Sequence, residues 1–208
     1  MSLSAGTADA ICQRAADALA GPHLHLRDQV LDALAVHVDE TGWRTRGDGR
    51  ALWTATTPDA VFVKIAEHCN REVFDALTGA YAGIVVSDRW NGFSHLDPTR
   101  RQVCWSHLQR DFRKHADGLG QQKAFGETGL EFAGRVFAAW RAYRTEHHDR
   151  DRLQAELAPL QDQLQALLEQ ASPKKARNRW HRRFRQQPAQ GLARALDLHR
   201  DRRRRAHE

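Results

Sequence analysis

The chain has 208 residues and a formal net charge of +6. This length allows one domain with a real core plus an insertion, and no apolar stretch is long enough to predict a membrane span. Residues 185–208 hold seven Arg against three acids, so the rest of the chain carries only about +2. Bulk charge therefore gives no argument for nucleic-acid binding. Three scattered cysteines without a C-x-x-C pair speak against a disulfide scaffold or zinc ribbon, and favour a cytoplasmic protein.

A helical lead-in is predicted over residues 1–34. Ile11, Ala15 and Leu19 recur at helical spacing, and Gly21-Pro22 predicts a break in the helix. The small-residue composition of this segment is not that of a cleavable signal peptide.

Three runs that alternate or are rich in β-branched and aromatic residues come next, separated by turn residues. Such turn-linked runs predict three antiparallel strands. A short helix should follow, with Asn70 as N-cap and Gly79 as its stop. The three runs are residues 35–44, 50–57 and 60–68.

Two further strands are expected after that helix. "GIVVSDRW", residues 83–90, is a short apolar run that ends in a carboxylate, which is typical of a strand buried on both faces. "QVCWSHLQRDFRKHA", residues 102–116, begins as another such strand and turns into a basic helix.

Residues 118–170 are helical throughout by their pattern, with two apolar stripes at helical spacing. We expect the two stripes to form an antiparallel helical hairpin inserted after the fifth strand; a dimerising coiled coil is the other interpretation. The first stripe comprises Leu130, Ala133, Val136, Phe137, Trp140 and Tyr143, and the second Leu153, Leu157, Leu160, Leu164 and Leu167.

The expected order βββαβαβ, with one carboxylate on the first strand and another just after the fourth, is a ribonuclease-H-like arrangement in a mixed α/β fold. In that fold the first and fourth strands are neighbours, so Asp39 and Asp88 would face each other within a core of residues 35–117. Two close carboxylates repel by about 4 kcal/mol at an effective dielectric near 20 unless a cation lies between them. Mg²⁺ suits such a pair, and two such ions can catalyse phosphoryl transfer. The alternative is that both acids are ordinary polar strand ends.

The motifs "HVDETGWR", "LWTATTPDA", "IVVSDRWNGFSHLDP", "RQVCWSHLQRDFRKHADG" and "KKARNRWHRRF" resemble the transposases of the bacterial insertion-sequence-66 family over residues 1–184. The resemblance implies a DDE catalytic domain in which Asp39 is the first acid and Asp88 the second. It also implies Mg²⁺ or Mn²⁺ as cofactor, with transposon ends and target DNA as substrates. Water and then a 3′-hydroxyl would attack phosphodiester bonds in strand cleavage and strand transfer.

Basic residues in two segments are candidate DNA contacts. His107, Arg110 and Arg113 lie on the helix after the fifth strand and suit phosphate contacts, although a solvated helix face explains them nearly as well. The segment 171–184, with Trp180 interleaved, is the best candidate for tracking a DNA backbone. Its basic residues are Lys174, Lys175, Arg177, Arg179, His181, Arg182 and Arg183.

Several residues near the acids admit two interpretations. Glu40 would be an outer-sphere partner of a metal or a solvent-facing strand residue. Trp43 and Trp90 would stack on a flipped base or, as we favour, pack beside the site. Cys104 and His107 form a C-x-x-H pair with no second pair in reach, which speaks against zinc.

The chain departs from the family pattern where the third acid, a Glu, should follow. After Phe184 it becomes Arg-rich without a core pattern, and GC-rich codons for residues 185–208 can be read in a neighbouring frame as a family-like continuation. We therefore expect 185–208 to be an out-of-frame, disordered tail. Glu127, Glu131 and Glu146 are not expected to replace the lost acid. The family's N-terminal DNA-end-recognition region is also expected to be missing.

The sequence thus predicts a transposase remnant without strand-transfer activity, in the cytoplasm and near the nucleoid. One alternative is a complete metal-dependent nuclease of the same fold. Another is a non-catalytic DNA-binding or regulatory fragment that forms homo-oligomers or associates with full-length transposase.

Overall fold

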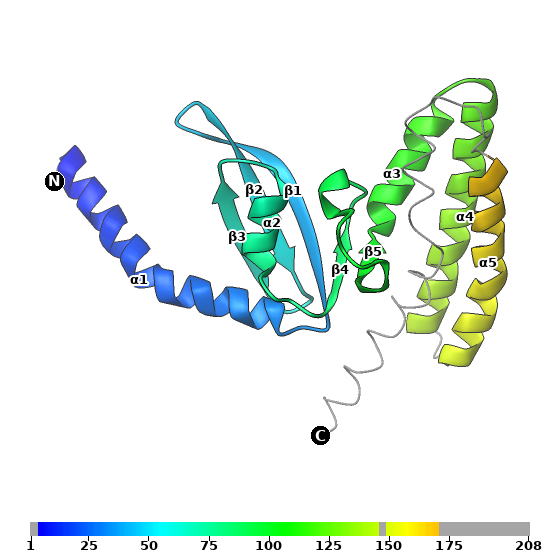
Figure 1. Ribbon diagram of the computed structural model, residues 1–208, viewed down its shortest axis with the longest axis horizontal. Coiled ribbons are helices and arrows are strands. Elements are labelled where there is room, and N and C mark those ends of the chain that lie inside the picture. Colours follow the sequence, from blue (N-terminus) through cyan, green and yellow to red (C-terminus); the bar gives the residue numbers. More distant parts are fainter. Residues whose placement is uncertain (1–3, 146–148, 171–208) are drawn as a thin grey trace. The chain divides into compact units, whose positions relative to one another are not determined.

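The computed structural model describes residues 4–145 and 149–170 (Figure 1). Within them lie five helices, five strands and two 3-10 turns. The helices are α1 (Ala5–Leu31), α2 (Arg71–Thr78), α3 (Trp105–Ala116), α4 (Gly120–Thr145) and α5 (Arg150–Gln170). The strands are β1 (Ala35–Thr45), β2 (Asp48–Thr56), β3 (Val61–Ala66), β4 (Ile84–Ser87) and β5 (Arg101–Val103), and the turns are η1 (Asn91–Phe93) and η2 (Pro98–Arg100).

The strands form one mixed sheet in the order β3-β2-β1-β4-β5. The chain divides into two compact units, one that ends at Val85 and one that begins at Val86, so the boundary falls inside β4. The prediction of a mixed α/β fold is confirmed.

The first unit is built on an antiparallel meander of β1, β2 and β3. Alternate residues of each strand face opposite sides of a sheet, and Val36, Val38 and Trp53 fill the buried side. α2 contributes Phe74 to this core, with its ring tilted against Trp53 at 6.5 Å between centroids. One buried face therefore explains the alternation in β1 and β2, whereas β3 also exposes Val61, Val63 and Ile65 on its other side.

Both predicted ends of α2 are confirmed. Asn70 caps the helix because its side-chain oxygen accepts the backbone N–H of Val73 at 3.0 Å. Gly79 ends it at a φ of 56°, a conformation that a residue without a Cβ adopts at little cost.

The predicted break at Gly21-Pro22 is wrong, because α1 continues through both residues to Leu31. Figure 1 shows a bend in this helix instead, which is the usual effect of an internal proline. Contacts near its C-terminal end stabilise the second half: Val30 is fully buried, and the Arg27 side chain donates to the Leu77 carbonyl at 3.0 Å. Tertiary packing therefore outweighs the local helix-breaking signal.

The expected order also places an α-helix between the fourth and fifth strands, and this is wrong as well. The connection consists of the 3-10 turns η1 and η2. Asp97 accepts the backbone N–H of Thr99 at 2.7 Å, directly before Pro98 opens η2. A side-chain cap followed by a proline starts a short turn at this point.

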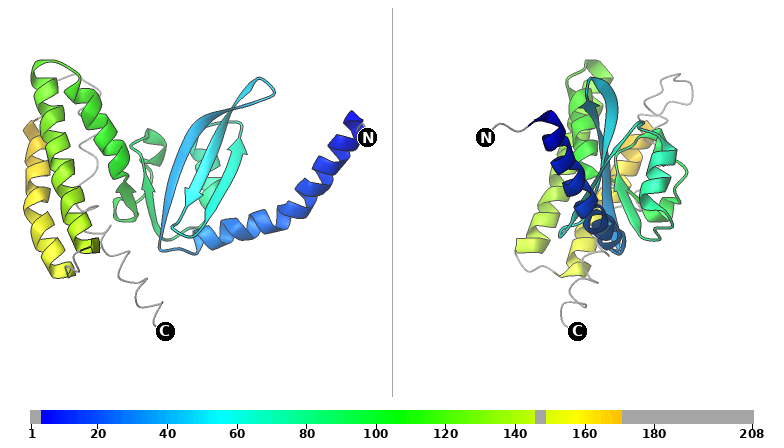
Figure 2. Two further views of the ribbon diagram at one scale, coloured as in Figure 1. Left: turned by 180° about the vertical axis from the view of Figure 1, so that it is seen from behind. Right: turned by 90° about the vertical axis from the view of Figure 1, so that its left-hand side faces the viewer.

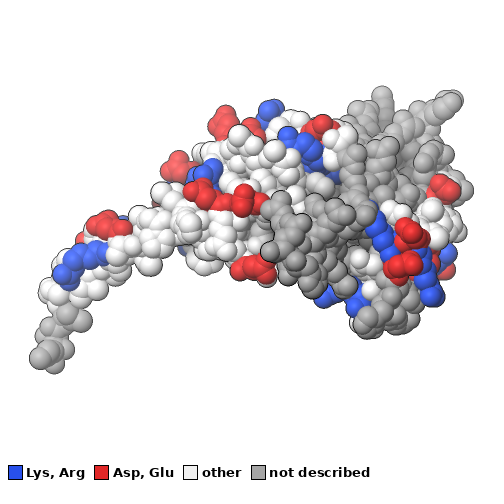
Figure 3. Space-filling model, turned by 90° about the horizontal axis from the view of Figure 1, so that it is seen from below, with Lys and Arg blue, Asp and Glu red and all other residues white. Residues whose placement is uncertain are grey.

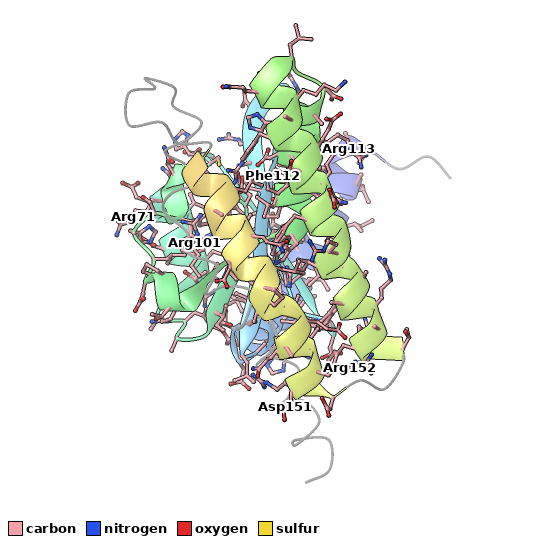
Figure 4. The ribbon with its side chains drawn as sticks, turned by 90° about the vertical axis from the view of Figure 1, so that its right-hand side faces the viewer. Arg71, Arg101, Phe112, Arg113, Asp151 and Arg152 are labelled. Atoms are coloured by element: carbon pink, nitrogen blue, oxygen red, sulfur yellow. The ribbon has the colours of Figure 1, made fainter. Side chains whose placement is uncertain are left out.

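The second unit is mainly helical, and α3, α4 and α5 enclose its core (Figures 2 and 4). The leucine stripe of α5 lies inside this core, with Leu153, Leu157 and Leu160 each almost fully buried. Phe112 of α3 is fully buried in the same cluster. Most of the second stripe is therefore covered within one chain, since Leu164 is buried as well and Leu167 is half-buried.

Two glycines of α4 set how closely α3 approaches it. A Cβ on Gly126 would lie 2.1 Å from the backbone nitrogen of Ala116, and one on Gly129 would lie 2.1 Å from the ring of Phe112. Only a residue without a side chain allows this spacing.

No helix in the described part of the chain is long and apolar enough to cross a membrane. The predicted basic segment 171–184 and the tail 185–208 lie outside the described residues.

Candidate active site

Asp39 lies in the middle of β1, on its exposed face. Its neighbours Val36 and Val38 face the core, so strand alternation turns Asp39 outward. Thr54, its register partner on β2, donates its hydroxyl to the Asp39 carbonyl at 3.2 Å. His37 shares the face of Asp39, and desolvation lowers the pKa of its ring.

Glu40 faces the opposite side of β1 from Asp39, because consecutive strand residues alternate. It is half-buried and pairs in register with the buried Trp53. The interpretation of Glu40 as a solvent-facing residue is therefore wrong. Its position also does not bring its carboxylate to the face that Asp39 occupies.

Asp88 follows the last residue of β4 and is half-buried. One carboxylate oxygen, Oδ1, accepts the backbone N–H of Trp90 at 2.9 Å, which closes a turn within the Asp88 loop. Ser87, directly before it, is buried, and its carbonyl accepts the N–H of Cys104 at 2.7 Å. Among the described residues, the other oxygen of Asp88, Oδ2, accepts no hydrogen bond.

Arg101, at the start of β5, holds the two ends of this loop. Its guanidinium donates to the Asp88 carbonyl at 3.0 Å and to the Phe93 carbonyl at 3.1 Å, and lies 5.6 Å from the centroid of the Phe93 ring. Burial lowers the pKa of Arg101, and the negative charge of Asp88 opposes that shift. A guanidinium with its fixed fork of donors thus positions the backbone at Asp88, before η1, and at the last residue of η1.

A second arginine ties the same loop to α3. Arg89, next to Asp88, forms an ion pair with Asp111, and both side chains are largely shielded from solvent. Lys114 lies 3.6 Å from the same carboxylate. Asp88 is therefore flanked by contacts that reach both β5 and α3.

The predicted basic residues of α3 lie where the sequence places them. Arg110 and Arg113 are exposed, and His107 is half-buried, while Leu108 and Phe112 form the buried face of the helix. Figure 3 shows basic and acidic side chains interspersed on the face that it draws, so charge on this face does not gather into a single basic field.

Trp90 and Trp43, the two tryptophans near the candidate acids, differ in their burial. Trp90 is half-buried and packs edge-on against Phe93 at 5.2 Å, as the packing interpretation expects. Trp43 is 45 % exposed, so the same interpretation is wrong for it. Cys104 is a free thiol, and no group of three His, Cys, Asp or Glu side chains able to hold a metal occurs within residues 4–145 and 149–170.

Sequence reasoning names Asp39 and Asp88 as candidate acids, but it does not name the residues that hold the Asp88 loop, which are Arg89, Arg101 and Asp111. Arg89 stands directly after Asp88 in the sequence, which is a usable signal. No local sequence signal identifies Arg101 or Asp111, because each contacts a residue more than ten positions away: Arg101 bonds the Asp88 carbonyl, and Asp111 pairs with Arg89. Asp39 belongs to the first unit and Asp88 to the second, and the residues of segment 171–184 fall outside the described part of the chain.

Comparison with known proteins supports the predicted resemblance. The model of the family described as "Transposase IS66 family" matches residues 1–202, which extends beyond the motifs that carry the resemblance and into the C-terminal tail. No curated protein and no solved structure matches the chain. A match over nearly the whole length establishes the family, and the chain therefore belongs to the IS66 transposases.

Proposed function

We propose that this chain carries part of a DDE-type catalytic domain, ribonuclease-H-like in fold, that acts on the ends of a transposon. Asp39 and Asp88 serve as two of its acids. Three observations support this: family membership, the position of β1 beside β4 in the strand order, and the surroundings of Asp88.

The observation that carries the proposal is the state of the Asp88 carboxylate. One of its oxygens is used by the Trp90 N–H, and Arg101 and Arg89 hold the loop on both sides. A carboxylate in a fixed orientation with one oxygen uncommitted within the described chain is suited to ligate a cation. A polar strand end needs no such support.

The residues present fit a hard divalent cation. Asp39 and Asp88 offer carboxylate oxygens, the ligand type that Mg²⁺ and Mn²⁺ prefer. When bound, such a cation supplies Lewis-acid activation of the attacking oxygen and stabilises the leaving oxygen of a phosphodiester. The Thr54 hydroxyl and strand pairing fix the backbone at Asp39, and Arg101 fixes it at Asp88.

Two acids are fewer than a DDE centre uses. Glu127 forms a 3.8 Å ion pair with Lys123 on α4, Glu131 is exposed on the same helix, and Glu146 lies outside the described residues. We therefore propose that residues 1–208 alone are inactive in strand transfer. We also propose that residues 185–208 are translated out of frame, which the family match as far as residue 202 does not itself support. A gene sequence without a family-like neighbouring frame after codon 184 would contradict this proposal.

The proposed metal site is tested by titrating the purified chain with Mn²⁺ and following free Mn²⁺ by electron paramagnetic resonance. Weak binding is expected, and Asp39→Asn and Asp88→Asn should each reduce the affinity at least about tenfold, since each removes a charged ligand. Asp9→Asn and Asp117→Asn serve as matched controls, because both acids are exposed and lie outside the proposed site. Unchanged binding in Asp39→Asn or Asp88→Asn would contradict the proposed site.

Activity is tested with DNA that carries the transposon ends. We expect no strand transfer by the 208-residue chain in Mg²⁺ or Mn²⁺. Transfer that disappears in Asp39→Asn would overturn the proposed inactivity while supporting the role of Asp39.

A further inference from the structure

The hairpin of β1 and β2 extends beyond the rest of the first unit as a two-stranded ribbon, residues 43–50 (Figures 1 and 2). β3 pairs with β2 only from Ala51 to Thr56, whereas β1 pairs with β2 as far as Thr45 and Asp48. Residues 43–49 are all exposed. Because the tip of this ribbon buries nothing, the core of the unit does not explain its length or composition.

The ribbon carries three arginines, and they differ in their surroundings. Arg50 pairs with Glu67 at 2.9 Å and lies 3.8 Å from Asp48, so acids of the same unit largely neutralise it. Arg44 and Arg46 form neither ion pairs nor side-chain hydrogen bonds with any described residue. The register partner of Arg44 is Gly49, which has no side chain to cover it. Two uncompensated positive charges therefore lie near the tip of the ribbon.

The turn at the tip is an unusual place for an arginine. Arg46 and Gly47 connect Thr45 to Asp48 with φ values of 52° and 92°. A two-residue turn with positive φ at both positions favours Asn, Asp or Gly at the first of them. Arg46 is the one non-glycine residue with positive φ in the described chain. Arg46 keeps this unfavourable backbone conformation although its side chain is exposed and fills no core. The strain therefore indicates a function for the Arg46 side chain.

We propose that this ribbon is a contact element for duplex DNA, with Arg44 and Arg46 binding backbone phosphates. This inference rests on the proposed function, which makes DNA the substrate. A two-stranded ribbon fits the major groove, which is about 12 Å wide, and the arginine fork suits phosphate oxygens.

The position of the ribbon relative to Asp39 agrees with this role. Trp43 shares the exposed face of Asp39 on the same strand, four positions further along, which corresponds to about 13 Å. Trp43 is 45 % exposed and can cover a sugar or base edge beside the phosphates. A duplex held by the ribbon would thus lie along the strand that carries the first proposed acid.

The test is binding of a short fluorescein-labelled DNA duplex to the 208-residue chain by fluorescence anisotropy, across a range of salt concentrations. Each phosphate contact adds about 0.9 to the magnitude of the slope of log K against log salt, so Arg44→Gln/Arg46→Asn should lower it by about 1.8. If the two proteins bind equally at about 1 M salt, the variant binds roughly 200-fold more weakly at about 50 mM and roughly 20-fold more weakly at about 200 mM.

The substitutions are chosen to separate DNA contact from folding. Asn tolerates positive φ better than Arg, so Arg44→Gln/Arg46→Asn should melt at the same temperature as the parent or higher. Arg44→Lys/Arg46→Lys keeps both charges and should retain the parental slope. Arg14→Gln/Arg141→Gln removes two exposed charges elsewhere and should also retain it.

Three results would overturn the inference. If the parent binds duplex DNA and Arg44→Gln/Arg46→Asn keeps its slope, or if Arg14→Gln/Arg141→Gln loses as much, the ribbon is not the contact and the proposed function still stands. If the parent binds no duplex DNA, the ribbon inference and a DNA substrate both fail.

Discussion

The strand that carries Asp39 and the loop that carries Asp88 are held by different kinds of contact. Asp39 is positioned by strand pairing and by the alternation of buried neighbours on β1. Asp88 sits in irregular chain, where Arg101 and Arg89 supply the contacts that a regular element would otherwise give. Pairing with the backbone of a neighbouring strand tolerates most substitutions, whereas a loop held by two side chains depends on both. The following experiments test this difference.

The largest loss of stability is expected from a substitution in the core of the first unit, at Trp53. Trp53→Ala removes a fully buried ring that packs on Phe74 and donates to the His68 carbonyl. We expect the free energy of unfolding to fall by about 3–5 kcal/mol. Trp43→Ala is the matched control on the same hairpin and should cost less, about 1–2 kcal/mol, because Trp43 is 45 % exposed. Urea unfolding followed by circular dichroism measures both, and equal effects would contradict the described core.

Arg101→Met tests the support of the Asp88 loop. It removes two charge-assisted hydrogen bonds to carbonyls, which should cost about 2–3 kcal/mol of stability. It should also weaken Mn²⁺ binding, because the carboxylate is no longer held in one orientation. Arg110→Met, at an exposed position of α3, is the control for both measurements. An Arg101→Met protein with parental Mn²⁺ affinity would show that the arginine does not position Asp88.

Gly129→Ala tests the packing of α4 on α3, the helix that contacts the Asp88 loop through Asp111. The added methyl would lie 2.1 Å from the Phe112 ring, so we expect a loss of about 1–3 kcal/mol. Gly134→Ala on the same helix meets no atom within 4 Å and should instead stabilise by about 0.5–1 kcal/mol. Opposite signs in thermal melting support the close helix contact, and a stabilising Gly129→Ala would contradict it.

The smallest effect is expected at the strand that carries Asp39. Thr54→Val removes the hydroxyl that donates to the Asp39 carbonyl and keeps the branched shape that strands favour. The loss should be about 0.5–1 kcal/mol, with little change in Mn²⁺ affinity, since strand pairing still holds β1. A loss of Mn²⁺ affinity as large as that of Arg101→Met would remove the distinction between the two acids.

The same difference explains how much the sequence could predict. Asp39 and the cap at Asn70 follow from patterns a few residues long, and both are where the sequence places them. The predicted break at Gly21-Pro22 was wrong because tertiary contacts of Arg27 and Val30 stabilise α1 beyond the proline. The partner of Arg27, Leu77, lies 50 positions away in the sequence. Local patterns therefore predict regular elements but not what packs on them.

The structure of the connection after Asp88 could not be predicted from local sequence patterns. An α-helix was expected between the fourth and fifth strands, and the chain forms two 3-10 turns held by the Arg101 side chain. A side chain that bonds two carbonyls across a loop leaves no periodic signal in the sequence. The contacts of Arg101 with the Asp88 loop are therefore accessible only from the structure.

The most direct test of the central claim is a comparison of Mn²⁺ binding in Asp39→Asn, Asp88→Asn and the double variant by electron paramagnetic resonance. If the two acids hold one cation together, the losses are not additive, and the double variant binds little more weakly than either single variant. Additive losses, or a single variant that binds as the parent does, would contradict a shared site.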